Sequence, residues 1–243
     1  NPPNPGGYRT DYFWKYLLSK DSVLDLVENF IHEFEERHED EEGMTEQKLI
    51  FPRYHQLNSV RSLLTDAKKK GVGENYLIQH STGSGKTFTI SWLAHQLTSL
   101  HDEDDNLIFD TVVVISDRTH LDEQLQYHVR QFEKTRGLVA NIDEHSDQLR
   151  NALEQGKKIV VSTLHKFPYI VEDIKEIPGQ DFAVIIEEAH SSQTGKMREK
   201  LNEVLSGDGD ETDSENLDDQ VEESIQKRAK LENASSFAFT ATP

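Results

Sequence analysis

Apolar residues in the main part of the chain gather in short runs that alternate with helical patterns. Two of these runs, Val112–Ile115 and Ala183–Ile186, are continuous, which is typical of strands buried on both faces of a parallel sheet. The strand candidates are residues 76–80, 111–115, 158–162, 182–186 and 236–239. Helix candidates that separate the earlier ones are residues 121–132, 147–155 and 164–174. This repetition predicts a doubly wound α/β domain with a mainly parallel sheet and right-handed crossovers.

The apolar residues before residue 51 show helical spacing. Apolar residues from Val23 to Phe34 recur three and four positions apart, and Asp21 is a suitable N-cap for this helix. Residues 35–45 have the composition of an exposed linker. We therefore expect residues 1–50 to form a short helical segment in front of the main domain.

The main domain is expected to span residues 51–243. Its first helix opens near Phe51 and ends at Gly71, after a run of lysines that suits the negative end of a helix dipole. An acidic stretch at about residues 206–220 contains no Lys or Arg. We expect this stretch to be a loop that faces away from any nucleic acid.

Composition narrows the classes of function. The 243-residue chain has a net charge of −19, which argues against a general polyanion-binding surface. It has no cysteine, so disulfides and cysteine-based zinc sites are excluded, and a reducing compartment fits. It also lacks a signal-peptide pattern and an apolar run of roughly 18 residues, so no membrane partner is expected. Because it starts at Asn1 and stops directly after Thr-Ala-Thr-Pro, we expect it to be a piece of a longer protein.

One stretch, His80-Ser-Thr-Gly-Ser-Gly-Lys-Thr87, joins an expected strand to an expected helix and has the composition of a phosphate-binding loop. Gly83 and Gly85 let the backbone approach phosphate oxygens, and the helix adds the positive end of its dipole. Lys86 is placed to reach the β- and γ-phosphates, and the Thr87 hydroxyl to ligate Mg²⁺. The predicted nucleotide-binding residues of this loop are Thr82, Gly83, Ser84, Gly85, Lys86 and Thr87.

The loop departs from the common pattern at its first position. That pattern opens with a Gly five residues before Gly85, and here His80 takes the place. The loop therefore depends on the shorter core from Gly83 to Thr87. A chance flexible turn is the alternative, and the flanking strand and helix argue against it.

A second polar centre directly follows the expected apolar strand at residues 182–186. It consists of Glu187, Glu188, Ala189 and His190. Beside a phosphate loop, one carboxylate at such a strand end holds Mg²⁺, and the next orients or deprotonates the attacking water. A strand that merely ends in exposed acids is the alternative.

Taken in order, Gly-Ser-Gly-Lys-Thr, Glu-Glu-Ala-His and Thr240-Ala-Thr-Pro243 resemble motifs I, II and III of superfamily 2 helicases and translocases. More narrowly, the chain resembles the motor (R, or HsdR) subunit of type I restriction–modification enzymes over nearly its whole length. The supporting segments are residues 7–14, 51–56, 78–83, 117–125, 163–167 and 188–193. The resemblance implies a RecA-like fold of the P-loop type.

The resemblance also implies roles for residues around the nucleotide, which becomes ATP with Mg²⁺. It makes Gln56 the reader of adenine, through the paired donor and acceptor of its side-chain amide. It makes Glu188 the candidate base. It implies that His190 couples the nucleotide site to Thr240 and Thr242, which in the family link hydrolysis to DNA movement.

Three further residues match family motifs that grip the backbone of one DNA strand. They are Arg118, Thr163 and Lys166. Such grips use phosphate contacts and ignore sequence, as a motor that moves along DNA requires. Ordinary surface charge is the alternative for the two cations.

The chain departs from the family at Glu187, where Asp is usual. Glu is one methylene longer and places its carboxylate roughly 1.5 Å further toward the metal. Because Mg²⁺ demands near-octahedral geometry, the longer side chain would displace a bridging water or misplace the ion. Both a natural variant and an engineered change that slows hydrolysis fit this position.

Two parts of the family's motor subunit are not found in this sequence. A nuclease of that class needs a metal-binding Asp and an acid-x-Lys pair on adjacent strands. The matches Glu46-x-Lys48 and Asp66-x-Lys68 fall in expected linker and helix contexts. The second RecA-like domain and its arginine finger are missing too. We therefore expect the segment before residue 51 to follow an absent nuclease domain, and the chain to bind nucleotide better than it hydrolyses it.

The resemblance thus implies part of an ATP-dependent double-stranded DNA translocase, the motor subunit of a type I restriction endonuclease, which pumps DNA before a separate nuclease domain cleaves it. Its expected partners are duplex DNA and the modification and specificity subunits, in the cytoplasm of a bacterium or archaeon. One alternative is a superfamily 2 RNA helicase, because motifs I to III do not separate the two. The other is a nucleotide-binding scaffold whose hydrolysis Glu187 impairs.

Overall fold

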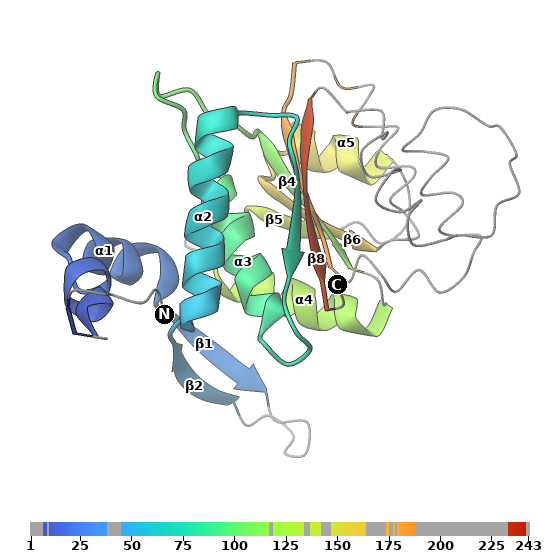
Figure 1. The fold of residues 1–243 in the computed structure, drawn as a ribbon. Coiled ribbons are helices and arrows are strands. Elements are labelled where there is room, and N and C mark those ends of the chain that lie inside the picture. The colour runs from blue at the N-terminus through green and yellow to red at the C-terminus, as the bar shows by residue number, and fades with distance from the viewer. Residues whose placement is uncertain are drawn as a thin grey trace, which may run out of the picture. The chain divides into compact units, whose positions relative to one another are not determined.

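The computed structural model divides the chain into two compact units, Asn1–Leu57 and Asn58–Pro243, with the division inside one helix (Figure 1). The residues described are 7–8, 10–37, 45–116, 119–133, 137–141, 147–163, 174, 177, 179–187 and 233–241. Within these ranges, no helix is both long enough and apolar enough to cross a membrane.

The first unit consists of short helical turns followed by a two-stranded antiparallel hairpin. Its elements are η1 (Phe13–Leu17), α1 (Lys20–Asp25), η2 (Leu26–Phe30), β1 (His32–Arg37) and β2 (Thr45–Ile50). The hairpin corrects the sequence prediction for this region. The predicted helix to Phe34 ends at Phe30, and the N-cap position is Ser19 rather than Asp21.

The error has a physical cause in the spacing of apolar residues. Phe34 fits a helical repeat with Phe30, but it also alternates with exposed Glu33 as the buried residue of a strand. Glu46-x-Lys48, expected in a linker, lies in β2, where Lys48 Nζ and Glu46 Oε2 form an exposed ion pair at 3.2 Å.

The second unit is built on a six-stranded sheet with the order β3-β8-β7-β4-β6-β5, in which every pairing is parallel. The strands are β3 (Asn75–Gln79), β4 (Thr111–Ser116), β5 (Val139–Asn141), β6 (Ile159–Thr163), β7 (Phe182–Ile186) and β8 (Ala234–Thr240). The sheet confirms the predicted α/β fold. Strand β5, which is three residues long, was not predicted.

The helices of this part of the chain agree with the predicted positions to within a few residues. They are α2 (Tyr54–Lys70), α3 (Lys86–Leu97), α4 (Thr119–Gln131) and α5 (Asp147–Glu154). Helix α3 contacts β4 and β7, and α4 contacts α3, β4 and β6. The predicted helix at residues 164–174 and the predicted acidic loop lie outside the described residues, apart from Ile174.

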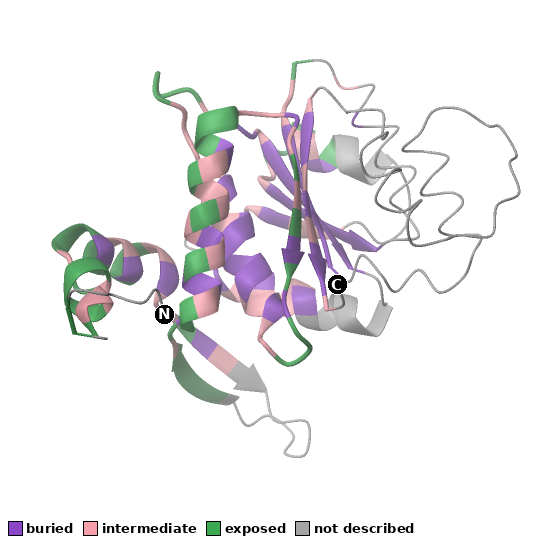
Figure 2. Cartoon of the chain, in the orientation of Figure 1, coloured by how far each residue is buried: buried purple, intermediate pink, exposed green. Residues whose placement is uncertain are grey.

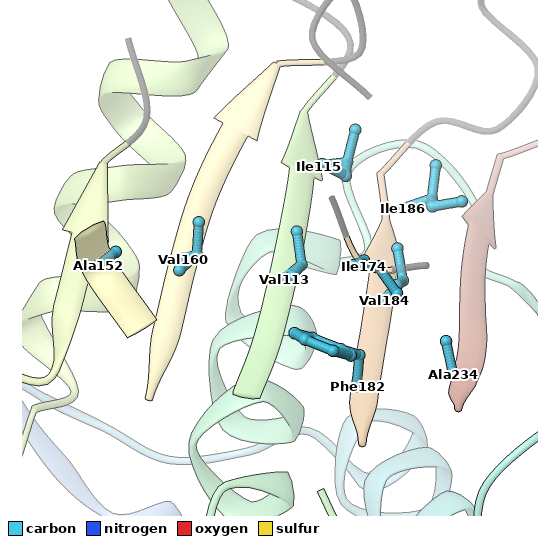
Figure 3. Close-up of a cluster of buried hydrophobic side chains, with 9 residues drawn as sticks. All are labelled: Val113, Ile115, Ala152, Val160, Ile174, Phe182, Val184, Ile186 and Ala234. Atoms are coloured by element: carbon cyan, nitrogen blue, oxygen red, sulfur yellow. The ribbon is translucent and has the colours of Figure 1, made fainter. Parts of the chain in front are cut away.

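The core lies in the centre of the sheet, where every residue of β4 and β7 is buried (Figure 2). A cluster on the sheet joins Val113, Val160, Phe182 and Val184 to Ala152 of α5 (Figure 3). Each Val or Phe side chain of this cluster stabilises the fold by roughly 1.5–3 kcal/mol when it is fully buried. The continuous apolar runs in the sequence therefore correspond to the strands that hold the sheet together.

Candidate functional site

Strands β3, β8 and β7 place polar segments side by side at the carboxyl edge of the sheet. Gln79 at the end of β3 pairs with Thr240, and Ile186 at the end of β7 pairs with Ala238 of the same strand β8. Neighbouring strands lie about 4.8 Å apart. The end of β8 therefore lies between the loop that follows β3 and Glu187, which directly follows β7.

The loop after β3 has the backbone of a phosphate-binding turn. Gly83 and Gly85 have φ angles of 74° and 84°, in the left-handed region that residues with a side chain rarely adopt. A Cβ on Gly83 would meet no atom within 4 Å, so the backbone conformation alone favours glycine there. The N–H of Ser84 donates to the Ser81 carbonyl at 3.1 Å and closes the turn. Thr82 and Gly83 are exposed, and the loop backbone is therefore open to a ligand.

Lys86 begins helix α3 and is only 8% exposed. Its Nζ donates to the His80 carbonyl at 3.5 Å, a long and therefore weak bond. The first turn behind it is held by hydroxyls, because Thr89 Oγ1 donates to the Gly85 carbonyl and Ser91 Oγ to the Thr87 carbonyl. The N-terminus of a helix disfavours a cation and favours an anion. A buried ammonium at this place is therefore suited to a bound polyanion.

Glu187 is 8% exposed and follows β7 directly. Its backbone N–H donates to the Ile115 carbonyl at 2.9 Å, so the main chain stays fixed to β4 one residue beyond the end of the strand. A buried carboxylate is costly unless a cation or hydrogen-bond donors compensate its charge. With the Thr87 hydroxyl, it offers the oxygen ligands that Mg²⁺ prefers.

Several predicted site residues lie outside the described residues, so their predictions stay untested. They are Arg118, Lys166, Glu188, His190 and Thr242. Thr163 is the last residue of β6, is 7% exposed and pairs with Ser116 of β4. It lies at the same carboxyl edge as Glu187, on the far side of β4.

Gln56 lies in the first turn of α2 and belongs to the first unit. It is 4% exposed, and its Oε1 accepts from the backbone N–H of Arg53 at 2.7 Å. A Gln at the third helical position that reaches back in this way forms half of a capping box. In this structure its amide oxygen accepts the hydrogen bond of a backbone N–H at the start of the helix. Its role as the adenine reader remains a prediction.

His80 contributes more to this edge than its sequence position indicated. Its N–H donates to the Thr240 carbonyl at 2.8 Å, and its Nε2 lies 3.0 Å from Ser59 Oγ on α2. The sequence marked His80 only as a departure from Gly. No spacing signal could reveal its contacts, because Ser59 lies 21 residues away and Thr240 is far along the chain.

Known proteins with similar sequences include an ATPase family and subunits of restriction enzymes. The SWI2/SNF2 ATPase family model matches residues 55–243. The C-terminal part of the putative type I restriction enzyme MpnIIP endonuclease subunit, from Mycoplasma pneumoniae, is 31% identical over 144 residues, which is 56% of this chain and 66% of that protein. The type I restriction enzyme HindI endonuclease subunit from Haemophilus influenzae is 29% identical over 238 residues, 93% of this chain and 20% of that protein.

Among solved structures, a nuclease-deletion mutant of the Type ISP restriction–modification enzyme LlaGI, in complex with a DNA substrate mimic, aligns with a TM-score of 0.51. It is 17% identical and covers 80% of this chain and 18% of its own, a likeness that concerns the fold. The relatives' names confirm the predicted resemblance to type I restriction enzyme subunits. The chain spans about a fifth of the length of the Haemophilus relative.

Proposed function

The chain belongs to the SWI2/SNF2 ATPase family, and from that premise we propose that it is the first RecA-like motor domain of an ATP-dependent double-stranded DNA translocase. The relatives support placing this motor in the endonuclease subunit of a type I restriction enzyme. One observation carries the proposal: β8 brings the phosphate loop, Thr240 and Glu187 to neighbouring places at one edge of the sheet.

The residues at this edge fit a nucleoside triphosphate with Mg²⁺. The loop backbone and the N-terminus of α3 would bind phosphate oxygens, and Lys86 would neutralise charge on the β- and γ-phosphates. Thr87 and Glu187 would hold the ion, which when bound polarises the phosphates and offsets their charge. Glu188 would accept the proton of the attacking water, and Gln56 would bind adenine.

DNA contact is proposed for the continuation of the same edge. Arg118, Thr163 and Lys166 would bind the phosphates of one strand, and His190 with the two threonines of the last motif would couple hydrolysis to movement. The main-chain bond between Thr240 and the first residue of the phosphate loop supports such coupling, because a shift at one segment acts directly on the other. A net charge of −19 favours such local contacts over a general basic surface.

The whole protein's activity is proposed from its relatives. It would pump duplex DNA together with modification and specificity subunits, ahead of cleavage by a nuclease domain. We place it in the cytoplasm of a bacterium or archaeon, where such DNA lies. Recognition of a DNA sequence would then belong to the specificity subunit, because phosphate contacts carry no sequence information.

The test is ATP hydrolysis by the intact subunit with duplex DNA, with RNA of the same length and with neither. We expect duplex DNA to stimulate hydrolysis and RNA to have little effect. Lys86→Ala serves as the control that removes the nucleotide site. Stronger stimulation by RNA would favour an RNA helicase, and hydrolysis that neither nucleic acid changes would contradict a motor.

A further inference from the structure

His80 stands at the point where several segments of the candidate site meet. It follows β3 directly, it opens the phosphate loop, and it is 8% exposed. Each part of the residue contacts a different segment. The N–H donates to β8, the carbonyl accepts from Lys86, and the ring nitrogen bonds to α2.

Two contacts hold the imidazole ring in position. On one side, Nε2 lies 3.0 Å from the hydroxyl of Ser59, which α2 carries three residues after Gln56. On the other, the ring meets Phe239 of β8 edge-on, with the ring centroids 6.1 Å apart. Phe239 is fully buried, so the imidazole rests against a rigid part of the sheet. An apolar side chain could supply the packing contact, but only a polar one can also bond to Ser59.

The carbonyl of the same residue accepts from the Lys86 ammonium, and the bond is long. The Lys86 ammonium has three N–H donors, of which this bond uses one, and the residue that supplies this carbonyl also supplies the ring that bonds to Ser59. A Gly at this position would hold neither α2 nor a preferred backbone conformation. The imidazole thus replaces the flexibility of the usual Gly with a link to Ser59 of α2.

We propose that His80 is a positioning residue, which through its bond to Ser59 holds the phosphate loop against α2 and so sets the affinity for the nucleotide. The proposal rests on the function proposed above. We expect the bond to act on binding rather than on the chemical step, because the ring contacts Ser59 of α2 and Phe239 of β8.

The experiment measures Mg²⁺–ATP affinity by calorimetry, and KM and kcat for hydrolysis, in the intact protein. His80→Phe keeps a ring against Phe239 and removes the nitrogen, and Ser59→Ala removes the hydroxyl while favouring the helix. Each should raise Kd and KM about fivefold, the effect of one net hydrogen bond, with kcat nearly unchanged. The double variant should be no weaker than either single one, because both remove the same bond.

Two further variants separate positioning from packing. His80→Gln, whose amide can again reach Ser59, should recover most of the lost affinity. Ser62→Ala, on an exposed position of the same helix, should change nothing. Variants that lower the melting temperature while Kd stays at the original value, or losses that add in the double variant, would overturn the proposal. A protein that binds no Mg²⁺–ATP, with or without Lys86→Ala, would instead contradict the proposed function.

Discussion

The two edges of the six-stranded sheet use polar residues in different ways. At the amino edge, side chains bond to the backbone of the turns that enter the strands. Ser235 Oγ accepts from the N–H groups of Gly73 and Glu74 at 2.9 and 3.1 Å, and ties β8 to the turn before β3. Asp110, which precedes β4, accepts from the N–H of Asp181 at 2.9 Å.

At the carboxyl edge, the polar side chains are nearly as buried, and that of Lys86 bonds to the backbone of the loop after β3. Lys86 and Glu187 are each 8% exposed, and Ser235 at the other edge is fully buried. Burial alone therefore does not distinguish a functional polar residue from a structural one. The difference lies in position, because Lys86 and Glu187 lie beyond the carboxyl ends of the strands, where open α/β sheets bind ligands.

The largest expected effect is a difference in nucleotide affinity between variants of two lysines, each of which donates to a backbone carbonyl. Lys86 donates to the His80 carbonyl at the carboxyl edge, and Lys158 donates to the Asp110 carbonyl, at 3.3 Å, at the amino edge. Lys86→Ala should lower the affinity for Mg²⁺–ATP by about 100-fold, through loss of charge-assisted bonds to phosphate. Lys158→Ala should leave it unchanged. Calorimetry measures both, and equal losses would remove the distinction between the edges.

The next largest effect is a difference in ATP hydrolysis between variants of the two acidic residues that flank β7. Asp181 precedes the strand and Glu187 follows it. Glu187→Gln should raise the Mg²⁺ concentration that half-saturates hydrolysis by about tenfold, because a charged ligand is lost. Glu187→Asp, which restores the family's usual residue, should hydrolyse ATP at least as fast as the present sequence. Asp181→Asn should leave hydrolysis unchanged. A Mg²⁺ requirement that does not respond to Glu187→Gln would show that this carboxylate does not hold the metal.

An intermediate effect on stability is expected at the amino edge. Ser235→Ala leaves two backbone N–H groups without their acceptor and should lower the free energy of unfolding by about 1–3 kcal/mol. Ser236→Ala, one residue along, removes only an exposed bond to Asn75 and should cost less than about 1 kcal/mol. Urea unfolding measures both. A change in nucleotide affinity on Ser235→Ala would mean that the amino edge also shapes the site.

The smallest effect concerns the pKa of the Asp181 carboxyl, which burial and the neighbouring Asp110 raise above its ordinary value. A carboxyl whose pKa is higher in the folded than in the unfolded protein stabilises the fold fully below the unfolded value, about 3.9. That contribution is lost as the pH rises through the folded value. Asp181→Asn should therefore stabilise the protein at pH 7 by less than about 1 kcal/mol, after allowance for solvent screening. The gain should vanish below about pH 3 in melting curves, and a gain that persists there would contradict this origin.

The sequence predicted those features whose cause is local. Strands β4 and β7 are continuous apolar runs, and the phosphate loop needs particular residue types in a fixed order, so both were recognisable before the structure. Strand β5 has only three residues, too few to show a period. The β1–β2 hairpin was missed because Phe34 fits both a helical and a strand repeat.

What the sequence could not supply is contact between distant segments. The position of β8 between β3 and β7 follows from packing rather than from any pattern within β8 itself. The bond between Ser59 and His80 is likewise tertiary, which explains why His80 was seen only as a missing Gly. Glu187, in contrast, was singled out from its place after an apolar strand; the structure shows that it is buried there, and its role in holding the metal stays a prediction.

The place of β8 also bears on how the protein is made. The hydrogen bond from the Gly73 N–H to Ser235 of β8 joins residues that are 162 positions apart. Contacts between residues so distant in the sequence form slowly during folding. During translation, β3 and β7 leave the ribosome well before residues 234–240, and they have no strand to join them until β8 arrives. We expect the proposed nucleotide site to form only after β8 is inserted, because β8 joins the strand before the phosphate loop to the strand before Glu187.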